Sequence, residues 1–240
     1  MIARYSRPEM AAVWSESHRL NLMLEVELLV CEALARRGTI PEAAAAELRS
    51  KASVDPARVA AIEAEVKHDV IAFVSATAET VGEAGRFLHF GMTSSDVLDT
   101  ALALQLVEAA GLLEKGIENL RDIVGQRSRE HRGTVMAGRT HGIQAEPITF
   151  GLKLAGWYAE LGRALERMKV ARTGIARAKL SGAVGSYAHN GPDIEAEVLG
   201  RLGLEAETVA TQVVPRDRHA AFLSTLALVA AAIERFATEL

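Results

Sequence analysis

The sequence contains one cysteine and no apolar N-terminal segment of the kind that a signal peptide has. A single thiol, that of Cys31, cannot close an intramolecular disulfide, and disulfide frameworks belong to oxidising compartments. No charge-free run approaches the roughly 18 to 20 residues that cross a bilayer. These absences predict a soluble, intracellular chain of the cytoplasm with no membrane partner.

Charge of one sign is also scarce, because the formal net charge of the 240 residues is −4. That balance provides none of the positive field that binding to a phosphate backbone requires, so we expect no nucleic-acid partner. The phosphate-binding loop of nucleotide triphosphatases, the Gly-x-Ser-x-Gly elbow and the Gly-x-Gly-x-x-Gly turn are missing as well. The seven histidines show no metal-ligand spacing, and the sequence therefore predicts no metal site.

Aromatic residues make up only 5% of the chain, and alanine, leucine, glutamate and arginine fill the intervals between the glycines. This composition favours helix over strand almost throughout and predicts an all-α fold. The hydrophobic fraction of 49% is enough for a sizeable core. We expect a small N-terminal helical domain over residues 1–92 and a long-helix bundle over residues 93–240.

Helix start and stop signals divide the first part of the chain. One helix is predicted to begin near Ser15 or Ser17 and to end at Gly38, a residue suited to a left-handed cap. Two shorter helices are predicted to open at Pro41 and Pro56, because proline is tolerated in a first helical turn. A further helix is expected over about residues 70–81.

Three long stripes of apolar residues, spaced three and four positions apart, follow in the second part. They predict helices over about residues 96–130, 154–175 and 222–240, the first of them on the order of 50 Å long. Such stripes are typical of helices that cross at a shallow angle in a bundle. Packing alone is a sufficient explanation for them.

Two intervals and the end of the sequence interrupt this helical pattern. The segment from His131 to Ile148 has no helical stripe, and we interpret it as a long loop. Ser181–Pro192 is a Gly-rich turn region, followed by a short helix expected over about residues 193–202. The last stripe is still in phase at Leu240 without a capping signal, so we expect the chain to be part of a longer polypeptide.

Two polar clusters lie at predicted helix ends. Lys67-His68-Asp69 joins two helices and, taken alone, is better explained as a charged surface edge. Thr93, Ser94 and Ser95 bring three hydroxyls to the start of the longest helix, where free amides and the helix dipole favour an anion. Thr93 and Asp96 also have the spacing of a simple capping box, which explains most of that cluster.

A third cluster occupies Gly138–Pro147, inside the expected loop, and contains Arg139, His141, Gln144 and Glu146. His141 can exchange a proton near neutral pH, and glycines on either side of it would let a substrate approach. Two further candidates, Arg4-Tyr5 and Gln212 with Arg216, would by themselves be surface contacts and a local cap.

Taken in chain order, these clusters resemble the adenylosuccinate lyase family of the fumarase/aspartase superfamily. The resemblance covers the whole sequence given. It is carried by Arg4-Tyr5-Ser6-Arg7-Pro8-Glu9-Met10, Lys67-His68-Asp69-Val70, Phe90-Gly91-Met92-Thr93-Ser94-Ser95-Asp96, Gly138-Arg139-Thr140-His141-Gly142-Ile143-Gln144-Ala145-Glu146-Pro147 and Ser181-Gly182-Ala183-Val184-Gly185. The His-Gly-Ile-Gln-Ala-Glu-Pro run together with Lys-His-Asp-Val is closer to adenylosuccinate lyase than to argininosuccinate lyase or fumarase.

The resemblance implies a β-elimination that releases fumarate from adenylosuccinate, giving AMP, and from the succinylated carboxamide ribotide of purine biosynthesis. It implies that His141 is the general acid that protonates the leaving nitrogen and that His68 lies near the phosphate and assists. It further implies a substrate-binding set made of Arg4, Tyr5, Lys67, His68, Asp69, Thr93, Ser94 and Gln212. It implies no metal or organic cofactor, and a homotetramer whose active sites are shared between subunits.

The sequence also departs from the family pattern. Family members are longer and carry a flexible, serine-rich loop with Met-Pro-x-Lys-x-Asn-Pro, whose serine removes the carbon-bound proton. No such loop occurs in the 240 residues, so no catalytic base is named.

Two other interpretations remain open at this stage. Another fumarate-releasing lyase of the superfamily, such as argininosuccinate lyase, or a cycloisomerase would share the general Gly-x-Thr-His pattern. A non-catalytic helical oligomerisation module would use the stripes for assembly and the polar clusters as caps.

Overall fold

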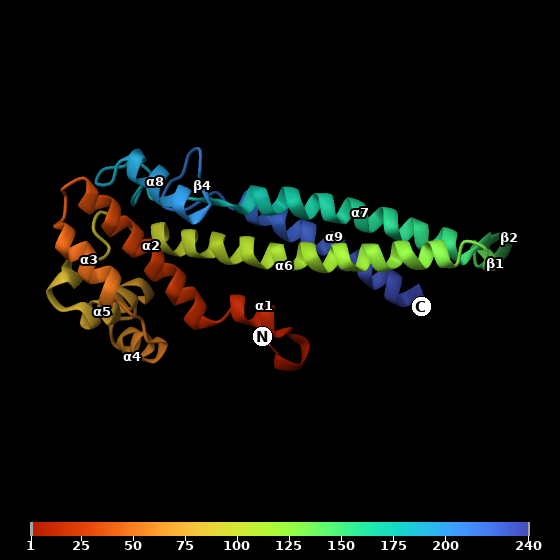
Figure 1. Cartoon of the computed structure of the whole chain (residues 1–240), viewed down its shortest axis with the longest axis horizontal. Helices are drawn as coiled ribbons and strands as arrows, with labels where there is room; N and C mark the ends of the chain where they lie inside the picture. Colours follow the sequence, from red (N-terminus) through yellow and green to blue (C-terminus); the bar gives the residue numbers. More distant parts are fainter. Residues whose placement is uncertain (1, 240) are drawn as a thin grey trace. The chain divides into compact units, whose positions relative to one another are not determined.

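The computed structural model describes residues 2–239 and confirms a fold built from helices (Figure 1). In chain order its elements are η1 (Ala3–Tyr5), α1 (Pro8–Val13), α2 (Glu16–Arg36), α3 (Glu42–Lys51), α4 (Pro56–Val66), α5 (Asp69–Val81), η2 (Gly82–Phe87), α6 (Ser94–Glu130), β1 (Val135–Thr140), β2 (Ile143–Thr149), α7 (Phe150–Ile175), β3 (Arg177–Ala178), α8 (Pro192–Leu202), β4 (Glu205–Ala206) and α9 (Asp217–Glu239).

The described residues form two compact units. The first unit contains the residues up to Ala109 together with Ala176–Pro215, and the second contains Ala110–Ile175 and the residues from Arg216 on. The boundary lies inside α6, because that helix is continuous and contributes to both units. The segment from Ala176 to Pro215 belongs to the first unit since α8 packs on α2. The domain division at residue 92 stays a prediction.

The helices of the first unit begin and end where their capping residues predict. The hydroxyl of Ser15 accepts a hydrogen bond from the His18 amide at the start of α2, and Gly38 follows the end of that helix with φ of +72°. Pro41 is the N-cap of α3 and Pro56 is the first residue of α4. The core of this unit is formed mainly by α2 and α5 with the first turns of α6, and includes Leu20, Met23, Leu34, Phe73 and Val97.

Three buried polar side chains on the first turns of α6 bind segments that are distant in the sequence. The Asp99 carboxylate accepts from the Val214 amide at 2.8 Å, and the Thr100 hydroxyl donates to the carbonyl of Lys179. The Gln105 amide donates to the carbonyl of Val13 at 2.7 Å. Since buried polar groups must be hydrogen-bonded, these contacts fix where the loops of the first unit meet α6.

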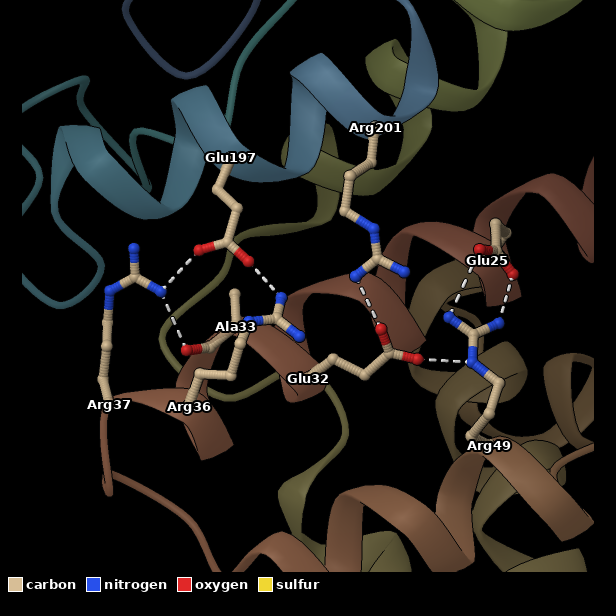
Figure 2. Close-up of polar contacts among 8 residues, drawn as sticks. All are labelled: Glu25, Glu32, Ala33, Arg36, Arg37, Arg49, Glu197 and Arg201. Atoms are coloured by element: carbon tan, nitrogen blue, oxygen red, sulfur yellow. Dashed lines mark hydrogen bonds and ion pairs between the residues drawn. The ribbon is translucent and has the colours of Figure 1, made fainter.

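A network of ion pairs on the surface of the first unit joins α2, α3 and α8 (Figure 2). Glu197 of α8 pairs with Arg36 and Arg37 at the end of α2. Glu32 of α2 binds Arg201 of α8 at 2.6 Å and Arg49 of α3 at 2.5 Å. Isolated surface pairs contribute at most about 1 kcal/mol each, but a connected network holds the outer face of α8 against α2 more firmly.

The second unit consists of the C-terminal part of α6, the helices α7 and α9, and the β1–β2 hairpin. Helices α7 and α9 lie side by side, with the Trp157 and Phe236 rings stacked at a centroid distance of 4.6 Å. The predicted stripe of α9 is buried at Phe222, Val229 and Phe236, but Ile233 is 45% exposed. Leu240, the last residue of that stripe, lies outside the described residues.

The segment from His131 to Ile148 is not the irregular loop that the sequence predicted, because most of it forms an antiparallel hairpin of β1 and β2. Thr140 pairs with Ile143, so that His141 and Gly142 form a two-residue turn, and both have positive φ, 52° and 74°. Two consecutive residues with positive φ define the type I′ turn that suits the twist of a hairpin. The pairing register shifts at Gly138, where a Cβ atom would come within 2.5 Å of the Glu146 carbonyl oxygen.

Among the described residues, one helix, α9, is long and apolar enough to cross a membrane by length and composition. The finding is weak evidence for a membrane span, because a core helix of a bundle passes the same test and α9 packs against α7.

We predict that Gly185→Ala lowers the free energy of unfolding by about 2 kcal/mol. Gly185 has φ of +78°, and a Cβ atom there would overlap the carbonyl oxygen of Ala210. Gly200→Ala is the matched control, because Gly200 is an exposed helical residue with nothing within 4 Å of an added Cβ. Denaturant unfolding followed by circular dichroism should show the control equal to or more stable than the unaltered chain, and an equally stable Gly185→Ala would contradict the account.

Candidate functional site

A cavity of about 330 Å³ in the first unit brings together two of the polar clusters singled out in the sequence. Its wall includes His68 from the start of α5 and Thr93 and Ser94 from the start of α6. Val70, Ile71, Val74 and Met92 supply an apolar side, and Ser75 and His89 complete the lining. Polar groups that converge on one wall of a partly apolar cavity are typical of a small-molecule site.

His68 is held by the backbone of α5. It is the N-cap residue of that helix, and its Nδ1 atom accepts a hydrogen bond from the Ile71 amide at 3.3 Å. Because Nδ1 acts as the acceptor, the neutral ring carries its proton on Nε2. His68 can therefore present an N–H donor, and its side chain remains 44% exposed.

His89, which belongs to none of the polar clusters recognised in the sequence, lines the same cavity. Its Nδ1 atom lies 2.7 Å from Oε1 of the fully buried Glu27, whose other oxygen accepts from the His89 amide at 2.6 Å. Burial lowers the pKa of His89, but the hydrogen bond and the charge of Glu27, with a contribution from Asp96, outweigh it, so that the pKa lies above its ordinary value. The His89 imidazole, which lines the cavity, therefore favours its cationic form more than an ordinary histidine does.

Thr93 and Ser94 are positioned by the N-terminus of α6. The Thr93 amide donates to the Asp96 carboxylate at 2.9 Å, which is one of the two hydrogen bonds of the predicted capping box. The Asp96 amide donates to the carbonyl of Thr93. Asp96 is fully buried and is paired with Lys179, so it belongs to the scaffold below the cavity. The hydroxyl groups of Thr93 and Ser94 lie on residues that line the cavity.

The other predicted binding residues of the first unit do not line this cavity. Lys67 ends α4 in a left-handed conformation with φ of 57°, and Asp69 is the first residue of α5, so both flank His68. Arg4 lies over the Tyr5 ring, 4.7 Å from its centroid, and both side chains are exposed. Gln212 is exposed in the loop that Asp99 holds through Val214.

His141 occupies the tip of the β1–β2 hairpin in the second unit, where its side chain is exposed. Histidine tolerates the left-handed conformation better than bulky or β-branched residues do, and Gly142 accepts it freely. A two-residue turn presents its side chains on a short, rigid support, so His141 is held by backbone pairing rather than by a flexible loop.

The first unit therefore offers imidazole donors, two hydroxyls and a helix N-terminus at one cavity, a set that suits an anionic ligand. The second unit presents the exposed imidazole of His141 at the tip of its hairpin. Within residues 2–239, no group of three or more His, Cys, Asp or Glu side chains is arranged to hold a metal ion.

Comparison with known proteins identifies the family. The profile of a family described as "Lyase" matches residues 3–240, which is nearly the whole chain. The chain belongs to this lyase family.

Curated relatives include an adenylosuccinate lyase from Synechocystis, 53% identical, and one from Bacillus subtilis, 50% identical, each matched over 100% of this chain and 56% of the relative. Similar solved structures include a fumarate lyase from Mesorhizobium, with a TM-score of 0.89 and 31% identity over 98% of this chain and 58% of that one. A 3-carboxy-cis,cis-muconate lactonizing enzyme from Pseudomonas putida has a TM-score of 0.90 and 31% identity over 99% and 56%. The chain spans little more than half the length of these proteins.

We predict that Glu27→Gln lowers the pKa of His89, because the substitution removes the charge that outweighs burial. Titration of the histidine ring signals by NMR measures this directly. Glu42→Gln, at an exposed position of α3, is the control and should leave the His89 pKa unchanged.

The same pair makes stability depend on pH. Since the pKa of His89 is raised above its ordinary value of 6.5, the stabilisation is complete below about pH 6.5 and is lost as the pH rises through the folded-state pKa. The unaltered chain should therefore lose more stability than Glu27→Gln as the pH rises through this range. Equal losses in the two proteins would contradict the assignment.

Proposed function

We propose that this chain is part of an adenylosuccinate lyase, which cleaves adenylosuccinate into AMP and fumarate and acts on the succinylated carboxamide ribotide of purine biosynthesis. The observation that carries the proposal is the 53% and 50% identity to two adenylosuccinate lyases over the full length of this chain. The muconate lactonizing enzyme is 31% identical to this chain, and its likeness supports the fold. It supports a lactonizing reaction less strongly than the two adenylosuccinate lyases support fumarate release.

The chemistry of the reaction matches the groups at the cavity. The substrate carries a phosphate and two carboxylates, which bind N–H and O–H donors. In the proposed arrangement, His68 contacts the phosphate, Thr93 and Ser94 hold the succinyl part with Gln212, and Arg4, Tyr5, Lys67 and Asp69 line the nucleotide site. His89, which shares the cavity and favours its cationic form, joins His68 on the phosphate.

The elimination breaks one carbon–nitrogen bond and one carbon–hydrogen bond, and a carbon–carbon double bond forms in fumarate. We assign the protonation of the leaving nitrogen to His141, because histidine is the side-chain type most often used for proton transfer near neutral pH. The base that takes the carbon-bound proton is not assigned to any residue of this chain, because the serine-bearing loop of the family is not among its 240 residues.

We further propose that the protein works in the cytoplasm as a homotetramer whose subunits share active sites. The helices of the second unit support assembly, because several large apolar side chains on them are exposed in the single chain. These are Ile123, Leu152, Tyr158, Val170, Leu223, Leu228 and Ile233. A surface of this kind on three helices is typical of an interface between copies.

Release of fumarate from adenylosuccinate, followed in a spectrophotometer, tests the proposed reaction. The protein at its natural length should convert adenylosuccinate to AMP and fumarate. If it releases fumarate only from argininosuccinate, or closes a muconate lactone instead, another member of the superfamily is correct. If it acts on none of these substrates, the oligomerisation module becomes the better account.

We predict that His141→Ala lowers kcat by about 100-fold to 10,000-fold, the usual contribution of a positioned general acid. Val135→Ala is the matched control, since Val135 lies on the same hairpin, is 73% exposed and is distant from the turn in the register. The control should retain its kcat. Normal turnover by His141→Ala would remove the central assignment of the mechanism.

A further inference from the structure

The segment from Lys179 to Asn190 binds both ends of the turn that connects His89 to α6. At one end, the Asn190 side-chain amide donates to the Phe90 carbonyl at 3.1 Å. Gly91 is packed so closely there that a Cβ atom would lie 2.8 Å from Asn190 Oδ1. At the other end, Lys179 is paired with Asp96. The turn between these anchors contains Met92, Thr93 and Ser94, which line the candidate site.

Lys179 is 1% exposed, and its ammonium group forms two hydrogen bonds in this buried position. Its ammonium group donates to Asp96 Oδ1 and, at 3.0 Å, to the Gly182 carbonyl. The Gly182 amide also donates to Asp96 Oδ1, at 3.3 Å. The second oxygen of Asp96 accepts from the Thr93 amide, so a continuous chain of polar contacts runs from Gly182 through Lys179 and Asp96 to Thr93.

The rest of the segment is hydrogen-bonded to Glu195 of α8. Both oxygens of Glu195, which is 2% exposed, are occupied, by the Leu180 amide at 2.7 Å and by the Tyr187 hydroxyl at 2.5 Å. Burial, reinforced by this carboxylate, raises the pKa of Tyr187 to about 12, so the hydroxyl remains a donor at physiological pH.

Stability alone is a weak reason for a buried ion pair, because apolar residues of similar volume often replace one without loss of stability. A buried ion pair does, however, hold the groups that are hydrogen-bonded to it in one orientation. Here the bonded group is the backbone of Thr93, which lines the cavity together with Ser94.

We propose that Lys179, through Asp96, is a positioning residue that sets the orientation of Thr93 and Ser94 for the carboxylate of the substrate. The proposal rests on the proposed lyase function and adds to it a residue with no contact to the cavity. Its effect falls on substrate binding rather than on proton transfer, because the hydroxyls bind the same carboxylate before and during the reaction.

The test uses two variants of the natural-length protein. Lys179→Met leaves Asp96 buried without its cation, and we expect a lower melting temperature. Lys179→Met combined with Asp96→Asn restores neutrality, and the asparagine oxygen can still accept from Thr93, so most of the stability should return. In both variants we expect KM for adenylosuccinate to rise about tenfold with kcat nearly unchanged, because the ammonium group that joins Asp96 to the Gly182 carbonyl is absent.

Glu197→Gln is the matched control. It weakens the surface ion pairs that bind α8, in the same unit, to Arg36 and Arg37 (Figure 2), and it should leave KM unchanged. This control separates a general loosening of the segment from the loss of the buried bridge.

The outcomes distinguish this inference from the proposed function. If the unaltered protein releases no fumarate, the proposed function fails first. If it is active and the double variant recovers both stability and normal KM, Lys179 has a structural role alone and the inference is overturned. Failure of both variants to fold would overturn it as well, since the pair would then be a requirement of the fold. A stable double variant with a raised KM supports it.

Discussion

The need to satisfy polar side chains buried on the first turns of α6 organises the first unit. Asp96, Asp99, Thr100 and Gln105 are all inaccessible, or nearly so, to solvent. Each obtains its partner from a segment remote in sequence: Lys179 and Gly182, the amide of Val214, the carbonyl of Lys179 and the carbonyl of Val13. An unpaired group at any of these positions would cost free energy comparable to a lost hydrogen bond or more, so the connections specify one arrangement of the loops.

The candidate binding residues and the candidate proton donor lie on different elements of the fold. The groups that we propose to bind the anionic substrate are at helix ends, at His68 on α5 and at Thr93 and Ser94 on α6, where amides and dipoles favour negative charge. The proton-transfer candidate, His141, is on a hairpin turn in the other unit. The proposed function therefore predicts that substitutions at these two places alter binding and proton transfer separately.

The sequence predicted the helices well because their signals are local. Each signal lies within a few residues of the structure that it determines. Examples are the N-cap Ser15, the prolines at positions 41 and 56, and the apolar stripes. The hairpin was missed because neither strand alternates clearly between apolar and polar residues. Its best local signal was the His141-Gly142 pair, which resembles the Asn-Gly type of two-residue turn.

The features of the site that escaped prediction depend on long-range contacts. His89 has no motif of its own, and its electrostatic character comes from Glu27, 62 positions away. Lys179 resembles an ordinary surface lysine in the sequence, and only the fold shows that it is buried against Asp96. Local patterns cannot report such pairs, whereas the clusters at His68 and at Thr93 and Ser94 were recognisable because the residues of each are adjacent in the chain.

The most direct test of the account is a crystal structure of the natural-length protein with AMP and fumarate bound. We predict the AMP phosphate within hydrogen-bonding distance of His68 and His89, and a fumarate carboxylate on Thr93 and Ser94. Ligands bound elsewhere, with this cavity empty, would contradict the assignment of the site.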